Sequence, residues 1–350
     1  MKKSFFTVLT AFAAMSLAMA YNPPVQGENL FGFTNPEQVT GGASSAGGGI
    51  RSITPSSTIW NPATGGLEEC PTIDVGYTAL FSGKESDLYG QAFGTGIIVP
   101  TDWCNVSGEI AGVFVPFKDM QLGNSFNLKF SVAKELIDKL YVGVGLGTGF
   151  FSGYETDWSL TADAGAIYAF GDLGFLRDFR VGASVLNIGK VYNQTEVYGA
   201  DGRKNSAGFS GFPYFVSLRS GVATKVVDND VCKVGLSVDV TTPFFQNLII
   251  DSGVQVELFD FIRITSSWQY NAYEYAQDRG TYLPTVGIVF KLNINTGASD
   301  YMKKHDWQTS ELSPSAAWKN VNGDVNAISV GTVLRLGALD NDAPDIEIWN

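Results

Sequence analysis

The chain has 350 residues, and 35 acidic residues against 23 Lys and Arg give a formal net charge of −12 at pH 7. This acidic balance argues against nucleic acid as a partner and against attachment to anionic lipid surfaces through bulk charge. Hydrophobic residues make up 45% of the chain, with 40 Gly, 24 Phe and 14 Tyr.

The first twenty residues have the features of a secretory signal peptide. Two lysines precede a mostly apolar stretch, residues 5–19, and Ala18-Met19-Ala20 offers a small-x-small cleavage site. No cysteine stands at the expected cleavage point, which argues against a lipoprotein. Beyond residue 20 no run of about 18 apolar residues occurs, so no transmembrane helix is expected. An exported, Gly-rich and aromatic-rich chain of this kind is either a soluble all-β protein or an outer-membrane β-barrel.

Residues 21–70 lack the pattern of a long regular element. Residues 21–40 are polar and rich in turn formers, which predicts an irregular periplasmic lead-in. Residues 41–66 (GGASSAGGGIRSITPSSTIWNPATGG) are rich in small residues and interrupted by Pro55 and Pro62. The stretch still carries apolar residues that need burial, namely Ile50, Ile53, Ile59 and Trp60. We therefore expect it to fold inward as a hatch, with the later strands closed around it.

Residues 71–350 alternate apolar with small or polar residues at a period of two. About thirteen segments of roughly ten residues follow one another, close to the length of a tilted strand that crosses a bilayer. They are residues 73–81, 90–99, 106–115, 126–133, 140–147, 160–170, 179–185, 216–222, 234–240, 254–258, 262–269, 286–292 and 328–336. Because such a barrel has an even number of strands, a fourteenth is expected, either at Ser315–Val321 or at Asp345–Trp349.

The two faces of these segments differ in chemistry. One face is apolar almost throughout, and the other carries Gly, Ser and Thr with scattered charges. The charged residues are Lys129, Arg180, Arg219, Lys233, Arg263, Lys291 and Arg335, with Asp74, Asp163, Asp239 and Glu257. A soluble sandwich buries the apolar face, whereas a membrane barrel turns it outward and has a polar lumen, so periodicity alone does not decide between them.

Connection lengths favour the membrane barrel. The longest connections, residues 150–158, 190–213 and 271–284, alternate with short ones such as residues 101–105 and 259–261. Long loops at one end and tight turns at the other are typical of outer-membrane barrels. The polar stretch 295–313 breaks this alternation unless a strand lies within it. The sequence thus predicts an all-β transmembrane antiparallel β-barrel of about 14 strands in the cell outer membrane, with a periplasmic or lumenal N-terminal segment.

The composition of the hatch suits a position inside such a barrel. A barrel of about fourteen strands has a lumen wider than its own side chains fill. Gly47, Gly48 and Gly49 would let the hatch backbone approach the wall closely, and Ser56 could hydrogen-bond to it. Pro62 fixes a bend and keeps the preceding residue out of the α region. The alternative is that Asn61-Pro62-Ala63 is only a turn before the first strand.

The stretch Gly41–Ala63, with GGA, a glycine cluster, a Pro-Ser-Ser turn and Asn61-Pro62-Ala63, resembles the N-terminal hatch of the FadL-type long-chain fatty acid transport porins. It looks closest to the shorter spirochaete branch, and the type IX secretion shuttle proteins share this architecture. The resemblance implies a fourteen-stranded barrel plugged by its N-terminus, diffusion of hydrophobic molecules, and ligand binding that moves the hatch. The loops after Gly83 and Phe117 are shorter than in the fatty acid transporters, which leaves the substrate open.

Several residues are candidates for contact with a ligand. Asn61, Pro62 and Ala63 belong to the hatch motif, and the lumen-side Arg180, Arg219 and Arg263 could hold a carboxylate headgroup in a bidentate manner. The alternative is that these arginines pair with wall carboxylates. Aromatic residues near strand ends are expected to form interface girdles rather than a ligand stack; they are Trp103, Trp158, Trp268, Tyr270 and Tyr273. The expected partners are a hydrophobic small molecule or fatty acid and outer-membrane lipid.

Catalysis, cofactors and metals have little support. His305 is the only histidine, it lies in a polar stretch beside Asp306, and no Gly-x-Ser-x-Gly motif accompanies it. No Cys/His cluster with metal-ligand spacing is present. Of the three cysteines, Cys70 and Cys104 fall near the same ends of adjacent segments, so that a bridge and three unpaired thiols are both open.

The sequence therefore predicts a hatch-gated channel for long-chain fatty acid-like or other hydrophobic molecules. The alternative is a shuttle or scaffold barrel that binds an exported protein through its outer loops. A transporter should contain an apolar lumenal pocket, whereas a shuttle should expose an apolar patch on residues 190–213 or 271–284.

Overall fold

The computed structural model describes residues 21–41, 43–118, 120, 122–153, 155–193, 197–198, 204–205, 211–294 and 310–337. The predicted signal peptide, His305, Asp306 and the alternative strand Asp345–Trp349 lie outside these residues. Within the described part of the chain, no helix is long and apolar enough to cross a membrane.

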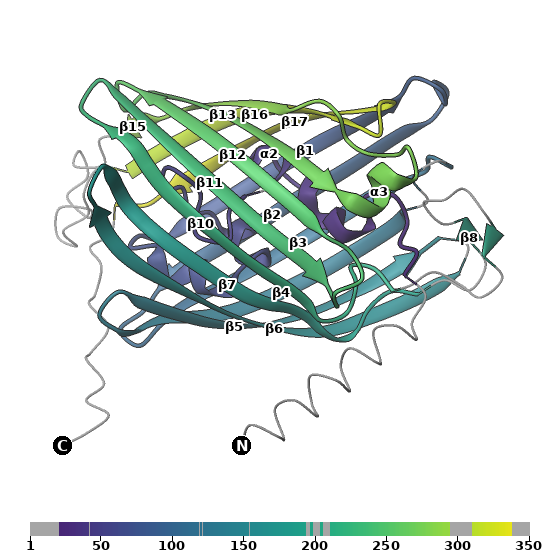
Figure 1. The fold of residues 1–350 in the computed structure, drawn as a ribbon, viewed down its shortest axis with the longest axis horizontal. Coiled ribbons are helices and arrows are strands. Elements are labelled where there is room, and N and C mark those ends of the chain that lie inside the picture. Colours follow the sequence, from purple (N-terminus) through teal and green to yellow (C-terminus); the bar gives the residue numbers. More distant parts are fainter. Residues whose placement is uncertain are drawn as a thin grey trace, which may run out of the picture.

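Fourteen antiparallel strand positions close into one barrel (Figure 1). Each strand pairs with its neighbours along the chain, and β1 pairs with β17 to close the ring. The strands are β1 (Thr72–Ser82), β2 (Tyr89–Pro100), β3 (Asn105–Val115), β4 (Gly123–Ile137), β5 (Leu140–Ser152), β6 (Thr156–Leu173), β7 (Leu176–Lys190), β10 (Ser217–Asp228), β11 (Cys232–Pro243), β12 (Ile249–Leu258), β13 (Ile262–Asn271), β14 (Thr285–Phe290), β15 (Leu292–Ile294), β16 (Ser310–Val321) and β17 (Val325–Arg335). β8 (Val197–Tyr198) and β9 (Lys204–Asn205) form a separate pair.

The fourteenth position is β16, so the prediction at Ser315–Val321 is confirmed. β14 and β15 both pair with β16 and together occupy one position of the barrel. β15 ends at Ile294 and β16 begins at Ser310. The predicted alternation of connection lengths holds only in part, because the connection 153–155, expected to be long, and the connection 322–324 are as short as 259–261. We call the end with connections 191–216 and 272–284 the loop end, and the end with connections 101–104 and 259–261 the turn end.

The barrel wall turns its apolar face outward. On β5, Val144, Leu146 and Phe150 are 59%, 62% and 70% exposed, while Gly147 and Gly149 between them are buried. Charged residues of the other face that are no more than 5% exposed include Asp74, Glu109, Asp163, Arg180, Arg219, Asp239, Glu257 and Arg263. This is the reverse of a soluble sandwich and is the arrangement of a barrel that meets lipid.

Most of the aromatic residues predicted for a girdle lie on this outer face. Trp103, Trp158 and Trp268 are 67%, 49% and 38% exposed, and Tyr270 shares the outward face of β13 with Trp268. Tyr273 instead packs its ring edge-on against Tyr21 at 5.1 Å. It therefore belongs to the contact between the N-terminal segment and the wall.

The N-terminal segment lies inside the barrel, where Figure 1 shows it in purple. It consists of short helical turns joined by irregular chain: η1 (Gly27–Phe33), α2 (Pro36–Thr40), η2 (Pro55–Ile59) and η3 (Pro62–Leu67). Residues 21–40, expected to be a periplasmic lead-in, are almost all buried. The ring of Tyr21 meets Tyr214 at the loop end, 5.2 Å away. The chain thus crosses the lumen from the loop end to join β1 at the turn end, and we call residues 21–70 the hatch.

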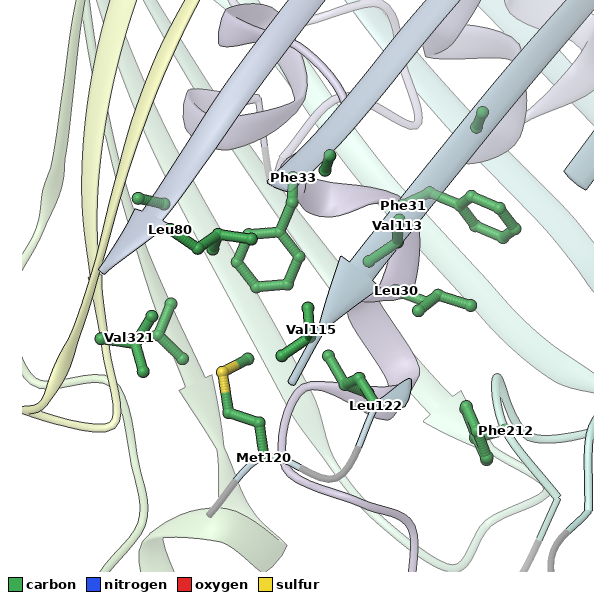
Figure 2. Packing of buried hydrophobic residues seen from close by; sticks show 14 of the residues in the cluster. Leu30, Phe31, Phe33, Leu80, Val113, Val115, Met120, Leu122, Phe212 and Val321 are labelled. Carbon is green, nitrogen blue, oxygen red and sulfur yellow. The ribbon is translucent and has the colours of Figure 1, made fainter. Parts of the chain in front are cut away.

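The apolar side chains of η1 explain this difference. Leu30, Phe31 and Phe33 pack into the largest buried cluster, together with residues from the loop end of the wall (Figure 2). This loop-end cluster includes Val113, Val115, Phe151, Val321 and Val325 of the wall strands and Phe117, Met120, Leu122, Tyr192 and Phe212 of the loop-end connections. Burying large apolar side chains is worth about 1.5–3 kcal/mol each, which outweighs the polar character of the rest of the segment.

No disulfide joins Cys70 to Cys104, since all three cysteines are described and none is bridged. The same region is held by hydrogen bonds. The Asn105 side chain donates from Nδ2 to the carbonyl oxygens of Gly65 and Glu68, at 2.8 and 2.6 Å. The hatch is thereby attached to the start of β3 without a covalent bond.

The apolar exterior leads to a folding prediction. Leu146→Lys places a charge at the middle of β5 on the outward face and should destabilise the barrel in a bilayer by about 2–4 kcal/mol. Asp102→Lys, at an exposed turn, is the control and should change little. Urea titration of folding into vesicles, followed by heat-modifiable migration in gels, measures both. Equal effects would contradict the orientation of the wall.

Candidate functional site

The glycine-rich part of the hatch lies against β7 and β11. Gly47 and Gly48 have φ of 85° and 76°, a left-handed turn that glycine adopts without strain. A Cβ on Gly49 would stand 2.5 Å from the carbonyl carbon of Gly235 on β11. The two backbones are therefore in direct contact, as predicted for this stretch. Neither position has room for a larger residue.

The Asn-Pro-Ala triplet both caps a helical turn and attaches the hatch to the wall. Asn61 is fully buried; its Oδ1 accepts from the Ala63 N–H at 3.0 Å, and its Nδ2 donates to the Ser45 and Ala166 carbonyls at 2.8 and 3.2 Å. A Cβ on Gly143 of β5 would stand 2.5 Å from Ala63 N and from Pro62 C. The triplet is thus more than a turn before β1.

Wall carboxylates satisfy backbone N–H groups of the hatch. Asp239 of β11 accepts from the Ser45 N–H at 2.9 Å and from its hydroxyl at 2.8 Å. Asp74 of β1 accepts from the Ser56 N–H at 3.0 Å, and Gln255 of β12 accepts from the Ile50 N–H at 2.6 Å. Irregular chain buried away from water needs such partners for its N–H groups. Alternation along the strands places Asp74, Asp239 and Gln255 on the lumen side, but it does not indicate which N–H group of the hatch each one meets.

The three arginines predicted to bind a ligand all hold the hatch. Arg180 of β7 donates from Nη2 to the Gly48 carbonyl at 2.7 Å, and Arg263 of β13 pairs through Nη2 with Glu37 at 2.7 Å. Arg219 of β10 pairs with Asp239 at 2.8 Å, as the alternative of internal pairing predicted. They lie on three separate strands rather than in one cluster. Their contact with a ligand remains a prediction.

Three cations of the wall also lie over aromatic rings of the hatch. Lys129 of β4 lies over Phe31 at 5.3 Å, Arg219 over Trp60 at 4.6 Å, and Lys319 of β16 over Phe33 at 5.3 Å from the ring centroids. Cation–π contacts gain strength when both groups are desolvated, to about 2 kcal/mol. Sequence patterns missed these pairs, because nothing in strand periodicity indicates which hatch ring meets which cation.

Two of the small cavities in the described part of the lumen lie beside the hatch and share part of their lining. They measure about 20 and 30 Å³, each enough for a single water molecule. Phe31, Lys129, Asn187 and Pro213 line both. Trp60 and Arg219 complete the second cavity. Side chains of the hatch occupy this part of the lumen, and the cavities left beside them are much smaller than the apolar pocket expected of a transporter.

Two buried acids attach the hatch to the loop end. Glu274 of α3 (Ala272–Ala276) accepts from the N–H and the Nε2 of Gln26 at 2.7 and 2.9 Å. Glu28 accepts from the Tyr214 N–H at 3.1 Å and from the Tyr21 hydroxyl at 3.0 Å. Burial raises the pKa of Glu28 and of Glu274 to about 7 in each case. Hydrogen bonds lower each pKa in part, as does the ammonium of Lys319 for Glu274.

No protein-family model matches this chain, and no curated protein sequence matches it. Among solved structures, the CymD monoaromatic hydrocarbon channel superimposes with a TM-score of 0.51 at 12% identity, covering 89% of this chain and 99% of that one. The Pseudomonas putida toluene transporter TodX superimposes with a TM-score of 0.50 at 9% identity over the same shares. At these identities the similarity shows a common fold, a closed barrel of fourteen strands.

Removing Asp239 tests whether wall charges hold the hatch. Asp239→Ala removes the nearer of the two carboxylates that pair with buried Arg219, leaving Asp251 at 3.5 Å, and takes the acceptor from the Ser45 N–H. The expected loss is up to about 3–5 kcal/mol. Hydrogen exchange of residues 43–50 should accelerate while that of the wall stays slow. Asp172→Ala, which removes an exposed pair with Arg177, is the control and should leave exchange unchanged. Slow exchange in both variants would contradict this role.

The raised pKa values of Glu28 and Glu274 predict a pH-dependent loop end. An acid with a higher pKa in the folded state binds more protons folded than unfolded, here between pH 4.5 and about 7. The attachment of the hatch to the loop end through these two acids is therefore strongest at low pH, and it weakens as the pH rises through 7. Exchange of residues 21–33, corrected for intrinsic rates, should increase at least about tenfold from pH 5 to pH 8, one pKa unit corresponding to tenfold. Glu274→Gln should reduce this dependence, and an unchanged profile would refute the assignment.

Proposed function

We propose that the protein is an outer-membrane channel through which hydrophobic small molecules pass by diffusion, gated by movement of the hatch. The observation that carries this proposal is the lumen itself. Two water-sized cavities share Phe31 as a wall, so displacement of one hatch ring would join them. The joined space would be lined by Ile59, Trp60, Leu186 and Ile249 on its apolar side. Such a lining suits an apolar solute better than a hydrated one.

Three further observations support a place in the outer membrane. The outward face is apolar, residues 1–20 have the pattern of a signal peptide, and the fold is similar to that of the CymD channel and the toluene transporter TodX. Membership of the FadL-type superfamily, and of its shorter spirochaete branch, is part of the proposal. The proposal also includes the orientation of the barrel, with the loop end outside the cell and the turn end in the periplasm.

The substrate is proposed only as a class, hydrophobic small molecules that include long-chain fatty acids. A carboxylate headgroup would have to displace the Gly48 carbonyl from Arg180, or Glu37 from Arg263. The predicted ligand contacts of these arginines and of Asn61 would therefore form only after the hatch has moved. Uncharged molecules need no such exchange and would pass once Phe31 is displaced.

The alternative of a protein-binding shuttle has one observation in its favour. Tyr282 and Leu283, in the 272–284 connection, are 54% and 48% exposed. Tyr282 also packs its ring against Tyr275 at 5.0 Å, which makes it part of a local aromatic group. An apolar surface of two residues in the described connection 272–284 is smaller than protein-binding patches usually are, and most of the other stretch expected to expose a patch, 190–213, lies outside the described residues.

The gate is tested with Phe31→Ala in the full-length protein. The variant should admit the hydrophobic fluorophore N-phenyl-1-naphthylamine several-fold faster than the wild type in cells with an intact lipopolysaccharide barrier, because the ring that separates the cavities is gone. Phe81→Ala, the same change on the outward face, is the control. Heat-modifiable migration verifies folding. Uptake equal to that of cells without the barrel, in wild type and variant alike, would refute the proposed function.

A further inference from the structure

An apolar groove crosses the outer surface of the barrel wall, away from the lumen. It has a volume of about 640 Å³, within the roughly 300–1,000 Å³ of small-molecule sites in proteins. Its lining comes from strands β1 to β6; the apolar members are Ile73, Ile97, Ile110, Leu128, Phe130, Leu146 and Leu160. It lies on the other side of the wall from the first lumenal cavity, and the two share Leu128, Lys129, Gly147 and Thr148.

The strand registers explain the shape of the groove. Ile97, Gly108, Phe130 and Leu146 form one row of cross-strand partners on the outward face. A second outward row, two residues along each strand, consists of Thr95, Ile110, Leu128, Thr148 and Leu160. Between them lies the row Gly96, Glu109, Lys129 and Gly147, which faces the lumen. The two outward rows are thus the banks of the groove, and the backbone of the middle row is its floor.

Gly108 widens the groove at its centre. It occupies an outward position on β3 where its neighbours in the row carry large side chains, and no atom lies within 4 Å of where its Cβ would stand. Its backbone lacks a positive φ, so the fold does not require glycine there. The absent side chain creates space rather than relieving strain. A larger residue at this position would fill the groove without disturbing the wall.

The surroundings of the groove indicate what occupies it. The bank residues Ile97, Leu128, Phe130 and Leu146 are 42%, 42%, 51% and 62% exposed, and they lie in the middle parts of their strands. In a bilayer-embedded barrel this level meets hydrocarbon and no water. We propose that the groove binds a single acyl chain of a bilayer phospholipid. The inference rests on the proposed membrane location.

A chain in the groove would contact protein on three sides. Two banks of branched and aromatic side chains and the backbone floor surround it, whereas a chain on a smooth part of the wall meets protein on one side. Dispersion contacts of about 0.1–0.2 kcal/mol per atom pair add over the length of such a chain. The groove should therefore retain one chain when the loosely held surrounding lipids are removed.

The first test is Gly108→Leu in the full-length protein. Native mass spectrometry after detergent extraction from phosphatidylethanolamine–phosphatidylglycerol vesicles should show one tightly held phospholipid on the wild type and at least a fivefold lower bound fraction on the variant. Ser220→Leu adds the same side chain to an exposed outward position on β10 and should retain the lipid. Heat-modifiable migration verifies that all three proteins are folded. Equal retention by the two variants would overturn the inference.

The second test places the chain directly. Vesicles containing a phospholipid with a photoreactive diazirine in its acyl chain should label peptides of β2 to β5 above all others in the wild type, and this excess should disappear in Gly108→Leu. Uniform labelling around the whole wall would overturn the proposed binding in the groove, although it would support the membrane location. Labelling of no strand would refute both. A free fatty acid that displaces the labelled lipid would identify a different occupant and would also count against the inference.

Discussion

The structure depends on charges of the barrel wall that are buried against an irregular segment. A lumen of fourteen strands is too wide for its own side chains to fill, and the hatch that fills it has few internal backbone hydrogen bonds. Asp239 shows how this is solved, because it accepts from the N–H and hydroxyl of Ser45 while it pairs with Arg219. Arg219 in turn lies over Trp60. One ion pair of the wall thereby holds both backbone and side chain of the hatch.

The two ends of the hatch are held by different forces. Near the turn end, Arg263 pairs with Glu37 and Arg335 with Glu68, and the chain continues directly into β1. At the loop end, η1 is held by apolar packing, cation–π contacts and protonatable acids. Removing a buried charge from its partner costs more than sliding an apolar ring along apolar neighbours. We therefore infer that opening begins at η1 and leaves the turn end in place.

Strand periodicity was sufficient to predict the strands of the wall, but it did not predict the contacts of the hatch. Alternation along a strand follows from backbone geometry, so residues such as Lys129 and Leu146 could be assigned locally to opposite faces of the wall. The partner of Lys129 could not be predicted in this way, because Phe31 lies far from it in sequence and reaches it only through the path of the hatch. For the same reason the role of Glu274 was not predicted, because its partner Gln26 is 248 residues away in the sequence.

The sequence by itself determined the all-β class, the number of wall strands, the division of each strand into an apolar and a polar face, and the inward position of the glycine-rich stretch, since each depends on local alternation, length or residue size. Only the tertiary structure decided which face meets lipid, that residues 21–40 enter from the loop end, and that the lumen-side arginines are engaged by the hatch. It also placed Gly108 between the bulky side chains of neighbouring strands. These outcomes depend on which distant segments meet once the ring closes, and closure is a property of the whole sheet.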